Sequence, residues 1–367
     1  MGMAAMNYNL LFGGWKDYES DGVKKEWGLY KDNLRQQQDY HPLPSSWATD
    51  RMYLFDPANP DWQSYIFQRE QEVFDAFNSD GWQIDQLGNR NTLYDYNGNS
   101  IDMISGYGKF LDKAREAFPD KALVFNAVGE YGQPVVAQKP VDFLYAEIWN
   151  TSSYSVLKMA ADYARRYSND QKSVVLAAYM NYKKSSGFFN EHSVRLADAV
   201  IMACGGTHLE LGDTGMLSGE YFPSAKLAMN DSLKTGMRHY YDFFTAYENL
   251  LRDGAVETKN ALEISGVDVS RSPAKKSVFA ITKEKGTDEI VHLINMTGVS
   301  SLSWRDDNGN MEEPLRQTDF EFKYYTDNEV KKPCLHRLIS MMAELSILIL
   351  KMAGTTRDST FWSLFPR

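Results

Sequence analysis

The sequence predicts an α/β protein: a (β/α)8 TIM barrel, incomplete in this chain, followed by an all-β sandwich. Three observations carry this prediction. Short apolar segments alternate with segments of helical periodicity over the first two-thirds of the chain, as in parallel β/α folds. Carboxylate and amide side chains gather where the predicted strands end, the edge at which such barrels keep their active sites. After Gly254 the pattern changes to the alternation that is typical of exposed strands.

Short apolar runs in the first part of the chain predict the barrel strands. Runs that are apolar throughout are typical of strands buried on both faces. We predict strands at residues 7–13, 51–55, 81–85, 122–126, 141–149, 173–180 and 208–211.

Segments with apolar residues at helical spacing separate these strands. The clearest helix covers residues 60–79 and begins with Asn59-Pro60-Asp61, a favourable start signal. Further helices are predicted at residues 101–118, 152–167, 191–203 and 225–251. We therefore assign residues 1–254 to the barrel, from about its third strand onward.

The region after Gly254 predicts a small β module. Residues 277–282 and 289–295 alternate with the strand period and are joined by a turn at Lys285-Gly286-Thr287, and residues 320–325 form another strand. We assign residues 255–332 to an incomplete C-terminal β-sandwich.

Both ends of the chain depart from these patterns. Only about six of these seven strands could belong to the barrel, which is too few for a closed eight-stranded one. Residues 1–6 resemble a helix end, so we expect the natural chain to extend upstream. Residues 333–367 lack strand alternation and clear turns. We interpret them as a non-native tail after a frameshift near Lys332, because permitted codons read in a shifted frame encode turns and strands. The nucleotide sequence tests this interpretation.

Composition excludes several classes of partner. The formal charge of −10 disfavours nucleic acid and anionic membranes, because phosphate binding requires a basic surface. Residues 335–353 are interrupted by charges and make a poor membrane span. Two cysteines, Cys204 and Cys334, form no disulfide framework, and no signal peptide is present. The aromatic share of 13% suits a sugar-binding cleft, although core packing accounts for most of these rings.

Two carboxylates at strand ends are the candidate catalytic pair. Retaining glycoside hydrolysis requires one nucleophile and one acid/base. Asp85 ends the run GWQID and precedes a polar loop, which suits the nucleophile. Glu147 lies in YAEIW among apolar and aromatic neighbours that would raise its pKa, as a general acid needs. Glu130, on the loop Gly-Glu-Tyr-Gly, is the alternative acid/base and otherwise a substrate contact.

Other polar and aromatic residues near the strand ends are candidate sugar contacts, because sugar hydroxyls require paired donors and acceptors. His208 is equally well explained as a structural histidine. No metal-ligand spacing, catalytic triad or phosphate-binding glycine loop stands out, so we expect no metal and no cofactor. The candidate contacts are Trp15, Gln86, Asn126, Glu130, Trp149, Tyr179, Asn181, His208, Glu210 and Asp213.

Several stretches together resemble glycoside hydrolase family 66, the endo-dextranases and cycloisomaltooligosaccharide glucanotransferases. These stretches occur in family order up to about Lys332: AAMNYNLLFGG, LFDPANPDWQ, DGWQIDQLG, VDFLYAEIW, AAYMN, CGGTHLELGD, EYFP, HLINM and WRD. The resemblance implies a catalytic barrel between two β-sandwiches and a retaining mechanism. It also implies that Asp85 is the nucleophile and Glu147 the acid/base, and that the strand at residues 7–13 is the barrel's third.

The resemblance implies a secreted bacterial enzyme that acts on dextran and isomaltooligosaccharides. Glucanotransferases of this family carry a carbohydrate-binding insert between the seventh and eighth strands. The short stretch between Met180 and His208 leaves no room for one, which favours endo-hydrolysis of α-1,6-glucosidic bonds. The alternatives are a glucanotransferase and, because the barrel is incomplete, an inactive glucan-binding fragment. We expect a monomer.

Overall fold

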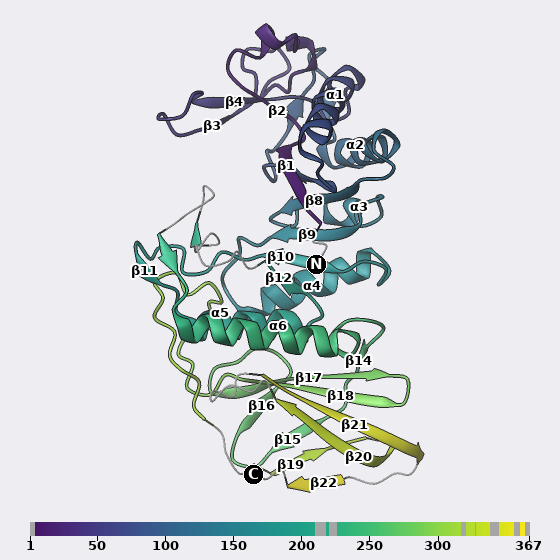
Figure 1. The fold of residues 1–367 in the computed structure, drawn as a ribbon, viewed down its shortest axis with the longest axis vertical. Coiled ribbons are helices and arrows are strands. Elements are labelled where there is room, and N and C mark those ends of the chain that lie inside the picture. Colours follow the sequence, from purple (N-terminus) through teal and green to yellow (C-terminus); the bar gives the residue numbers. More distant parts are fainter. Residues whose placement is uncertain are drawn as a thin grey trace. The chain divides into compact units, whose positions relative to one another are not determined.

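The computed structural model describes residues 4–209, 218–219, 226–316, 321–326, 328–337, 345–355 and 360–363. It divides into two compact units (Figure 1). The first unit consists of Met1–Glu147 and Tyr163–Lys172, and the second of Ile148–Asp162 and Ser173–Arg367. Each unit is described by itself.

The first unit is built on a parallel sheet. Its strands lie in the order β1-β5-β8-β9, and neighbouring strands pair in parallel. Leu10 of β1 lies opposite Asp85 of β5, and Val128 of β8 lies opposite Glu147 of β9. The strand bounds are β1 (Met6–Leu10), β5 (Gly81–Asp85), β8 (Ala122–Val128) and β9 (Phe143–Glu147).

Helices connect these strands and cover one face of the sheet (Figure 1). They are α1 (Pro60–Phe77), α2 (Met103–Ala117) and α3 (Gln133–Val136). The predicted helix start at Asn59 is confirmed, because the Asn59 side chain accepts hydrogen bonds from the backbone N–H groups of Asp61 and Trp62 at 2.9 and 3.1 Å. The helix ends at Asn78, which adopts the left-handed conformation common after helices.

Strand alternation divides the sheet into an apolar face and a polar face. Trp82 on β5 packs toward the helices, with ring centroids 5.8 Å from Phe110 and 6.4 Å from Phe118. Gln83 and Asp85 lie one and three positions after Trp82 on β5, so alternation places them on the opposite face. The register places Tyr8 on this face of β1 and Glu147 on this face of β9.

A long excursion separates β1 from α1. It contains a three-stranded antiparallel sheet of β2 (Gly13–Gly14), β4 (Arg51–Leu54) and β3 (Tyr40–Pro42). Two 3-10 turns precede β3, η1 (Tyr18–Asp21) and η2 (Lys25–Trp27). A hairpin of β6 (Leu93–Tyr94) and β7 (Ser100–Ile101) follows β5. The strand predicted at 51–55 therefore belongs to this excursion and is not a strand of the parallel sheet.

The second unit begins with further β/α elements. Strands β10 (Val174–Ala177) and β12 (Thr207–His208) pair in parallel around the intervening α5 (Glu191–Ala203). The pair β11 (Gly187–Phe188) and β13 (Leu227–Ala228) leads to α6 (Asp231–Leu251). Helix α4 (Tyr154–Tyr167) contributes residues to both units.

Two sheets follow α6 and share one core. The larger sheet has the order β14-β17-β18-β21-β20, with β16 beside β17, and the smaller has the order β15-β19-β22. Ile264 and Tyr324 of the smaller sheet are buried in one cluster with Val278, Val291 and Leu293 of the larger. The bounds are β14 (Val256–Glu257), β15 (Leu262–Ile264), β16 (Asp268–Ser270), β17 (Ser277–Lys285), β18 (Asp288–Asn295) and β19 (Glu321–Tyr324).

The last strands correct one expectation about residues 333–367. This stretch was expected to lack strand alternation, but it contains all or part of three strands. In chain order they are β20 (Asn328–Arg337), β21 (Leu345–Thr355) and β22 (Thr360–Ser363). Strand β21 pairs antiparallel with β18 and with β20. The run LSILILKM is rich in β-forming residues, which explains the pairing. The frameshift itself stays a prediction.

The α/β class with a parallel central sheet is confirmed, and the domain boundaries at residues 254 and 332 stay predictions. Among the described residues, no helix is both long and apolar enough to cross a membrane.

Candidate active site

Asp85 is a carboxylate held by several hydrogen bonds at the end of a strand. It is the last residue of β5, and its two oxygens accept three hydrogen bonds. The backbone N–H of Gln86 and the Asn126 Nδ2 each donate to Oδ1 at 2.8 Å. The Tyr8 hydroxyl donates to Oδ2 at 2.5 Å. These donors come from β1, from β8 and from the residue directly after β5, so neighbouring parallel strands fix the orientation of the carboxylate.

Two opposing effects act on the charge of Asp85. Burial raises its pKa, because a carboxylate loses hydration when it leaves water. The three hydrogen bonds lower the pKa, because they stabilise the ionised form. Burial is the larger effect, so the pKa of Asp85 lies above the ordinary aspartate value. A carboxylate that is poorly hydrated yet held in one orientation suits nucleophilic attack.

Glu147 ends β9 on the same polar face of the sheet. Its residue is 9% exposed, and its strand is separated from that of Asp85 by β8 alone. Its backbone oxygen accepts a hydrogen bond from the Gly129 N–H at 2.8 Å, which holds the loop after β8 beside it. A mostly buried carboxyl group in this position suits a general acid/base.

The pKa values of two tyrosines depend on both carboxylates. The pKa of Tyr8 is raised by loss of hydration first, then by the negative charge of Asp85, with a smaller effect from Glu147. The pKa of Tyr145 is raised by burial first, then by Glu147 and Asp85. The charges of both carboxylates thus affect both hydroxyls, which agrees with the register that places all four side chains on the sheet's polar face.

Tyr8 was missed by the sequence analysis. It is 58% exposed although its hydroxyl binds Asp85, so its ring offers a flat surface beside the proposed nucleophile. The signal available in the sequence was the alternation of β1, which places Tyr8 on the face opposite to Asn7. Assigning that face to the active site required the register with β5.

Glu130, the alternative acid/base, lies on the loop that follows β8. Its φ of +62° is in the left-handed region, which is uncommon for a residue with a side chain. Burial raises its pKa. Glu130 is held by a loop and Glu147 by a strand, so the assignment of Glu147 as acid/base is retained and Glu130 stays a candidate substrate contact.

The other candidate contacts of the first unit have different environments. Gln86 is 1% exposed, and its side chain bonds to the Asn126 carbonyl and the Gly88 N–H, so its expected sugar contact is revised to a structural role. Asn126 orients Asp85 directly. Trp15 is 41% exposed on the excursion and donates to Asp21 at 2.5 Å, so it stays a candidate sugar contact.

Trp149 and Tyr179 form an aromatic cluster in the second unit. Their rings stack with centroids 5.2 Å apart. The Arg305 guanidinium lies 5.1 Å from the Trp149 ring centroid, a cation–π distance. Trp149 is half-buried and keeps an exposed part, whereas Tyr179 is buried. Trp149 is therefore the better candidate contact of the two.

Asn181 and His208 have structural environments, which corrects their expected sugar contacts. Asn181 is fully buried, donates to the Asp306 carbonyl at 2.8 Å and accepts from the Asn190 N–H at 2.8 Å. His208 is buried with Nδ1 2.6 Å from Asp198 and Nε2 2.9 Å from the Ala178 carbonyl. Both ring nitrogens are thus engaged, as in the structural alternative stated for His208. Glu210 and Asp213 lie outside the described residues.

Among the described residues, no group of three or more His, Cys, Asp or Glu side chains gathers as metal ligands do, and the expectation of no metal stays a prediction. The first unit holds the predicted nucleophile Asp85 and the predicted acid/base Glu147 on one face of its sheet, with the exposed Tyr8 beside Asp85. The sequence model of glycosyl hydrolase family 66 matches residues 1–341. The chain belongs to this family.

Relatives of this family 66 chain have both transferase and hydrolase names. A cycloisomaltooligosaccharide glucanotransferase of Niallia circulans is 29% identical over 470 aligned positions, covering 89% of this chain and 48% of the relative. A dextranase of Streptococcus salivarius is 28% identical over 309 positions, covering 70% of this chain and 37% of the relative. The chain therefore spans about half the length, or less, of the curated relatives that it matches.

Solved structures show which fold this family 66 chain shares. A cycloisomaltooligosaccharide glucanotransferase of Paenibacillus sp., solved with cycloisomaltoheptaose, matches with a TM-score of 0.83 at 23% identity, covering 96% of this chain and 72% of that one. An α-amylase of Anoxybacillus matches with a TM-score of 0.52 at 11% identity, covering 96% and 77%. At these identities the likeness establishes the fold alone.

Proposed function

We propose that this chain carries the catalytic site of an endo-acting dextranase that hydrolyses α-1,6-glucosidic bonds with retention. One observation carries the proposal: Asp85 and Glu147 end strands β5 and β9 on one polar face of the sheet, with β8 alone between them. Membership of family 66 and the dextranase relative support the choice of an α-glucan as substrate.

In the proposed mechanism, Asp85 attacks the anomeric carbon and Glu147 protonates the departing O6. The C1–O6 bond breaks as the bond from C1 to the Asp85 carboxylate forms, which gives a β-glucosyl-enzyme. Glu147 then removes a proton from water, whose oxygen displaces Asp85 from C1 and restores the α configuration. Asn126, Tyr8 and the Gln86 N–H hold the Asp85 carboxylate in position throughout.

We propose further that the parallel strands belong to a (β/α)8 barrel. The catalytic residues lie at the carboxyl ends of β5 and β9, which is the side on which such barrels place their active sites. Secretion and a monomeric state are also proposed, on the resemblance to the family.

Transglycosylation to cyclic products is the second candidate, because the Niallia and Paenibacillus relatives are glucanotransferases. The Niallia alignment extends over 470 positions although this chain has 367 residues, so that relative carries segments that this chain lacks. This favours hydrolysis, in agreement with the short stretch between Met180 and His208.

The test is reducing-sugar release from dextran by this chain and by Asp85→Asn and Glu147→Gln. We expect each substitution to lower turnover at least about a hundredfold, because each removes a group that exchanges a bond or a proton. The matched control is Asp120→Asn. Asp120 is exposed and lies just before β8, at the amino end of that strand, so this variant should retain activity. Substantial turnover in either active-site variant would refute the assignment.

Product analysis separates the candidate reactions. NMR of freshly released sugar should show the α-anomer first, as retention requires. Cyclic isomaltooligosaccharides would favour the transferase. Dextran binding without any bond cleavage would identify an inactive glucan-binding fragment.

A further inference from the structure

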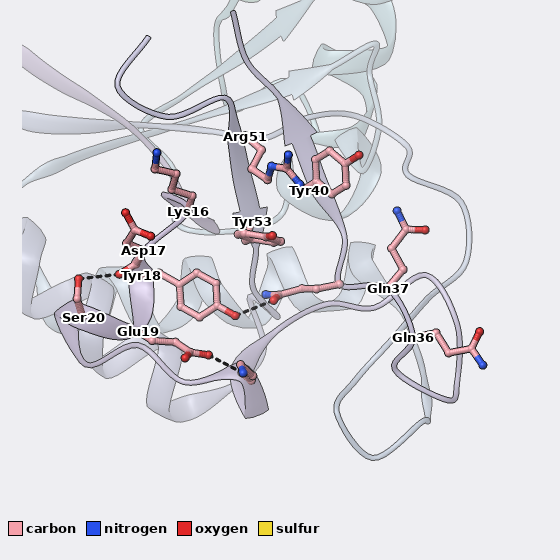
Figure 2. Close-up of a pocket in the computed structure, with 12 residues that line it drawn as sticks. Lys16, Asp17, Tyr18, Glu19, Ser20, Gln36, Gln37, Tyr40, Arg51 and Tyr53 are labelled. Carbon is pink, nitrogen blue, oxygen red and sulfur yellow. Dashed lines mark hydrogen bonds and ion pairs between the residues drawn. The ribbon is translucent and has the colours of Figure 1, made fainter. Parts of the chain in front are cut away.

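The excursion between β1 and α1 contains a second candidate site. Its pocket, of about 740 Å³, lies wholly in the first unit (Figure 2). Residues of η1, β3 and β4 line it together with the glutamine run 36–38. This volume is within the usual range for small-ligand pockets.

Three tyrosines form the aromatic part of the pocket. The Tyr53 ring lies 5.5 Å from that of Tyr18 and 6.1 Å from that of Tyr40, with edge-to-face geometry in both pairs. Tyr18 is buried, and its hydroxyl donates to Gln38 at 2.7 Å. Tyr40 and Tyr53 are only half-buried, and Figure 2 shows the three rings across the middle of the pocket. Arg51 and Lys31 lie over the Tyr40 ring, at 5.2 and 5.6 Å from its centroid, so Tyr53 is the ring on which we expect a pyranose to pack.

The charges around the pocket compensate one another. Lys25 is paired with Glu19 at 3.1 Å, and Arg51 is paired with Asp50 at 3.0 Å. Lys16 and Asp17 contribute one charge of each sign. The remaining polar groups are uncharged, above all the amides of Gln36 and Gln37, each of which both donates and accepts hydrogen bonds. This chemistry suits a neutral ligand with many hydroxyl groups and disfavours an anion.

The excursion that forms the pocket begins at the end of the sheet where Asp85 lies. The excursion leaves β1 directly after Leu10, the residue opposite Asp85. The Arg90 guanidinium, on the loop after Asp85, donates to both oxygens of Asp39 at 2.5 and 2.6 Å. Asp39 immediately precedes Tyr40, so the wall of the pocket is fixed to the nucleophile's own loop.

We propose that this pocket is an accessory binding site for a non-reacting stretch of the glucan chain. The choice of α-1,6-glucan rests on the function proposed above. The choice of a neutral saccharide rests on the pocket's own chemistry. A polymer held there stays at high effective concentration near Asp85, so long dextran benefits from the pocket and short oligosaccharides do not.

The first test uses hydrogen exchange in the intact chain with and without dextran. We expect dextran to protect the backbone at residues 16–20 and 36–53, and β-1,4-linked cellohexaose to leave it unprotected. This measurement requires no substitution, so folding defects do not affect it. Absence of protection in these segments, or equal protection by cellohexaose, would overturn the proposal.

The second test compares Tyr53→Ala with Tyr163→Ala, a tyrosine that is 39% exposed on α4. We expect Tyr53→Ala to weaken dextran binding at least about fivefold in affinity electrophoresis, as truncation of an interface aromatic commonly does. Tyr163→Ala should bind as the parent chain does. Turnover of isomaltotriose should be equal in all three proteins.

The outcomes separate this proposal from the proposed function. Protection of the pocket without bond cleavage would refute the dextranase function and support the accessory site. Dextran cleavage with unchanged affinity in Tyr53→Ala would support the function and refute the accessory site.

Discussion

The Asp85 carboxylate illustrates how single residues set the chemistry of this chain. Its burial alone would favour the protonated form, which cannot attack a sugar. Three donors from Tyr8, Asn126 and the Gln86 N–H compensate part of that cost. The carboxylate is therefore poorly hydrated, while its hydrogen bonds favour the ionised form that can attack a sugar. Tyr8 is the donor that can be removed with the least disturbance, because its ring is mostly exposed.

We predict that Tyr8→Phe lowers kcat/KM on dextran by about tenfold or more, since a hydrogen bond to a charged group contributes roughly 1.5–3 kcal/mol. The Tyr8 hydroxyl lowers the pKa of Asp85, so its loss raises that pKa further. Because Asp85 must be ionised to attack, the acidic limb of the pH profile should move to higher pH. Carbon-13 NMR of the Asp85 carboxyl measures the same shift without turnover.

The matched control for that prediction is Tyr65→Phe, on helix α1 at the opposite face of the sheet. It should leave both the rate and the acidic limb unchanged. An unchanged Asp85 pKa in Tyr8→Phe would contradict the role given to the Tyr8 hydroxyl.

At the scale of elements, an ion pair fixes the excursion to the loop after β5. Asp39 is fully buried, and Arg90 binds it through two nitrogens. Lys31 adds a longer contact at 3.6 Å. Arg90 also donates to the Tyr40 carbonyl at 3.0 Å, so one guanidinium holds the start of β3. Short strands such as β2 and β3 are weak by themselves and need such a connection.

We predict that Asp39→Asn destabilises the protein by about 3–5 kcal/mol, because it leaves a largely buried guanidinium without its counter-charge. Urea denaturation monitored by tryptophan fluorescence measures the loss. Glu116→Gln removes the exposed Lys113–Glu116 pair and should cost less than about 1 kcal/mol. Equal losses of stability in the two variants would show that the Asp39 pair contributes no more than an exposed ion pair.

At the scale of the whole molecule, one buried lysine connects the helical and β parts of the second unit. Lys283 of β17 is 2% exposed, and its ammonium donates to the carbonyls of Ala203 and Leu251 at 2.7 and 2.6 Å. These carbonyls lie at the ends of α5 and α6, where the helix dipole favours a positive charge. A single side chain therefore caps two helices.

We predict that Lys283→Met lowers stability by about 3 kcal/mol or more, since it leaves two buried carbonyls without a donor. Lys285→Met is the matched control, because Lys285 caps the Asn249 carbonyl at the surface and its loss should cost under about 1 kcal/mol. Differential scanning calorimetry on both variants tests this. A Lys283→Met variant as stable as the Lys285→Met variant would refute the capping role.

The sequence by itself determined the α/β class, most elements of the β/α part and the choice of Asp85 and Glu147 as the candidate pair. Each of these follows from local information: apolar periodicity, a capping residue such as Asn59, or a carboxylate where an apolar run ends. The sequence analysis failed where local patterns were misleading, as in the stretch after Lys332 and in the strand at 51–55, which joins the excursion.

Only the tertiary structure decided which polar residues face the site. Gln86, Asn181 and His208 were expected to contact sugar, yet each has its polar atoms bonded within the protein. Tyr8 lies within a family-like stretch but was not singled out there, and the pairing of β1 with β5 brings it to Asp85. Alternation gives a residue one of two faces, but the register between strands distant in sequence decides what that face meets. That register depends on long-range packing, which no local stretch of the chain encodes.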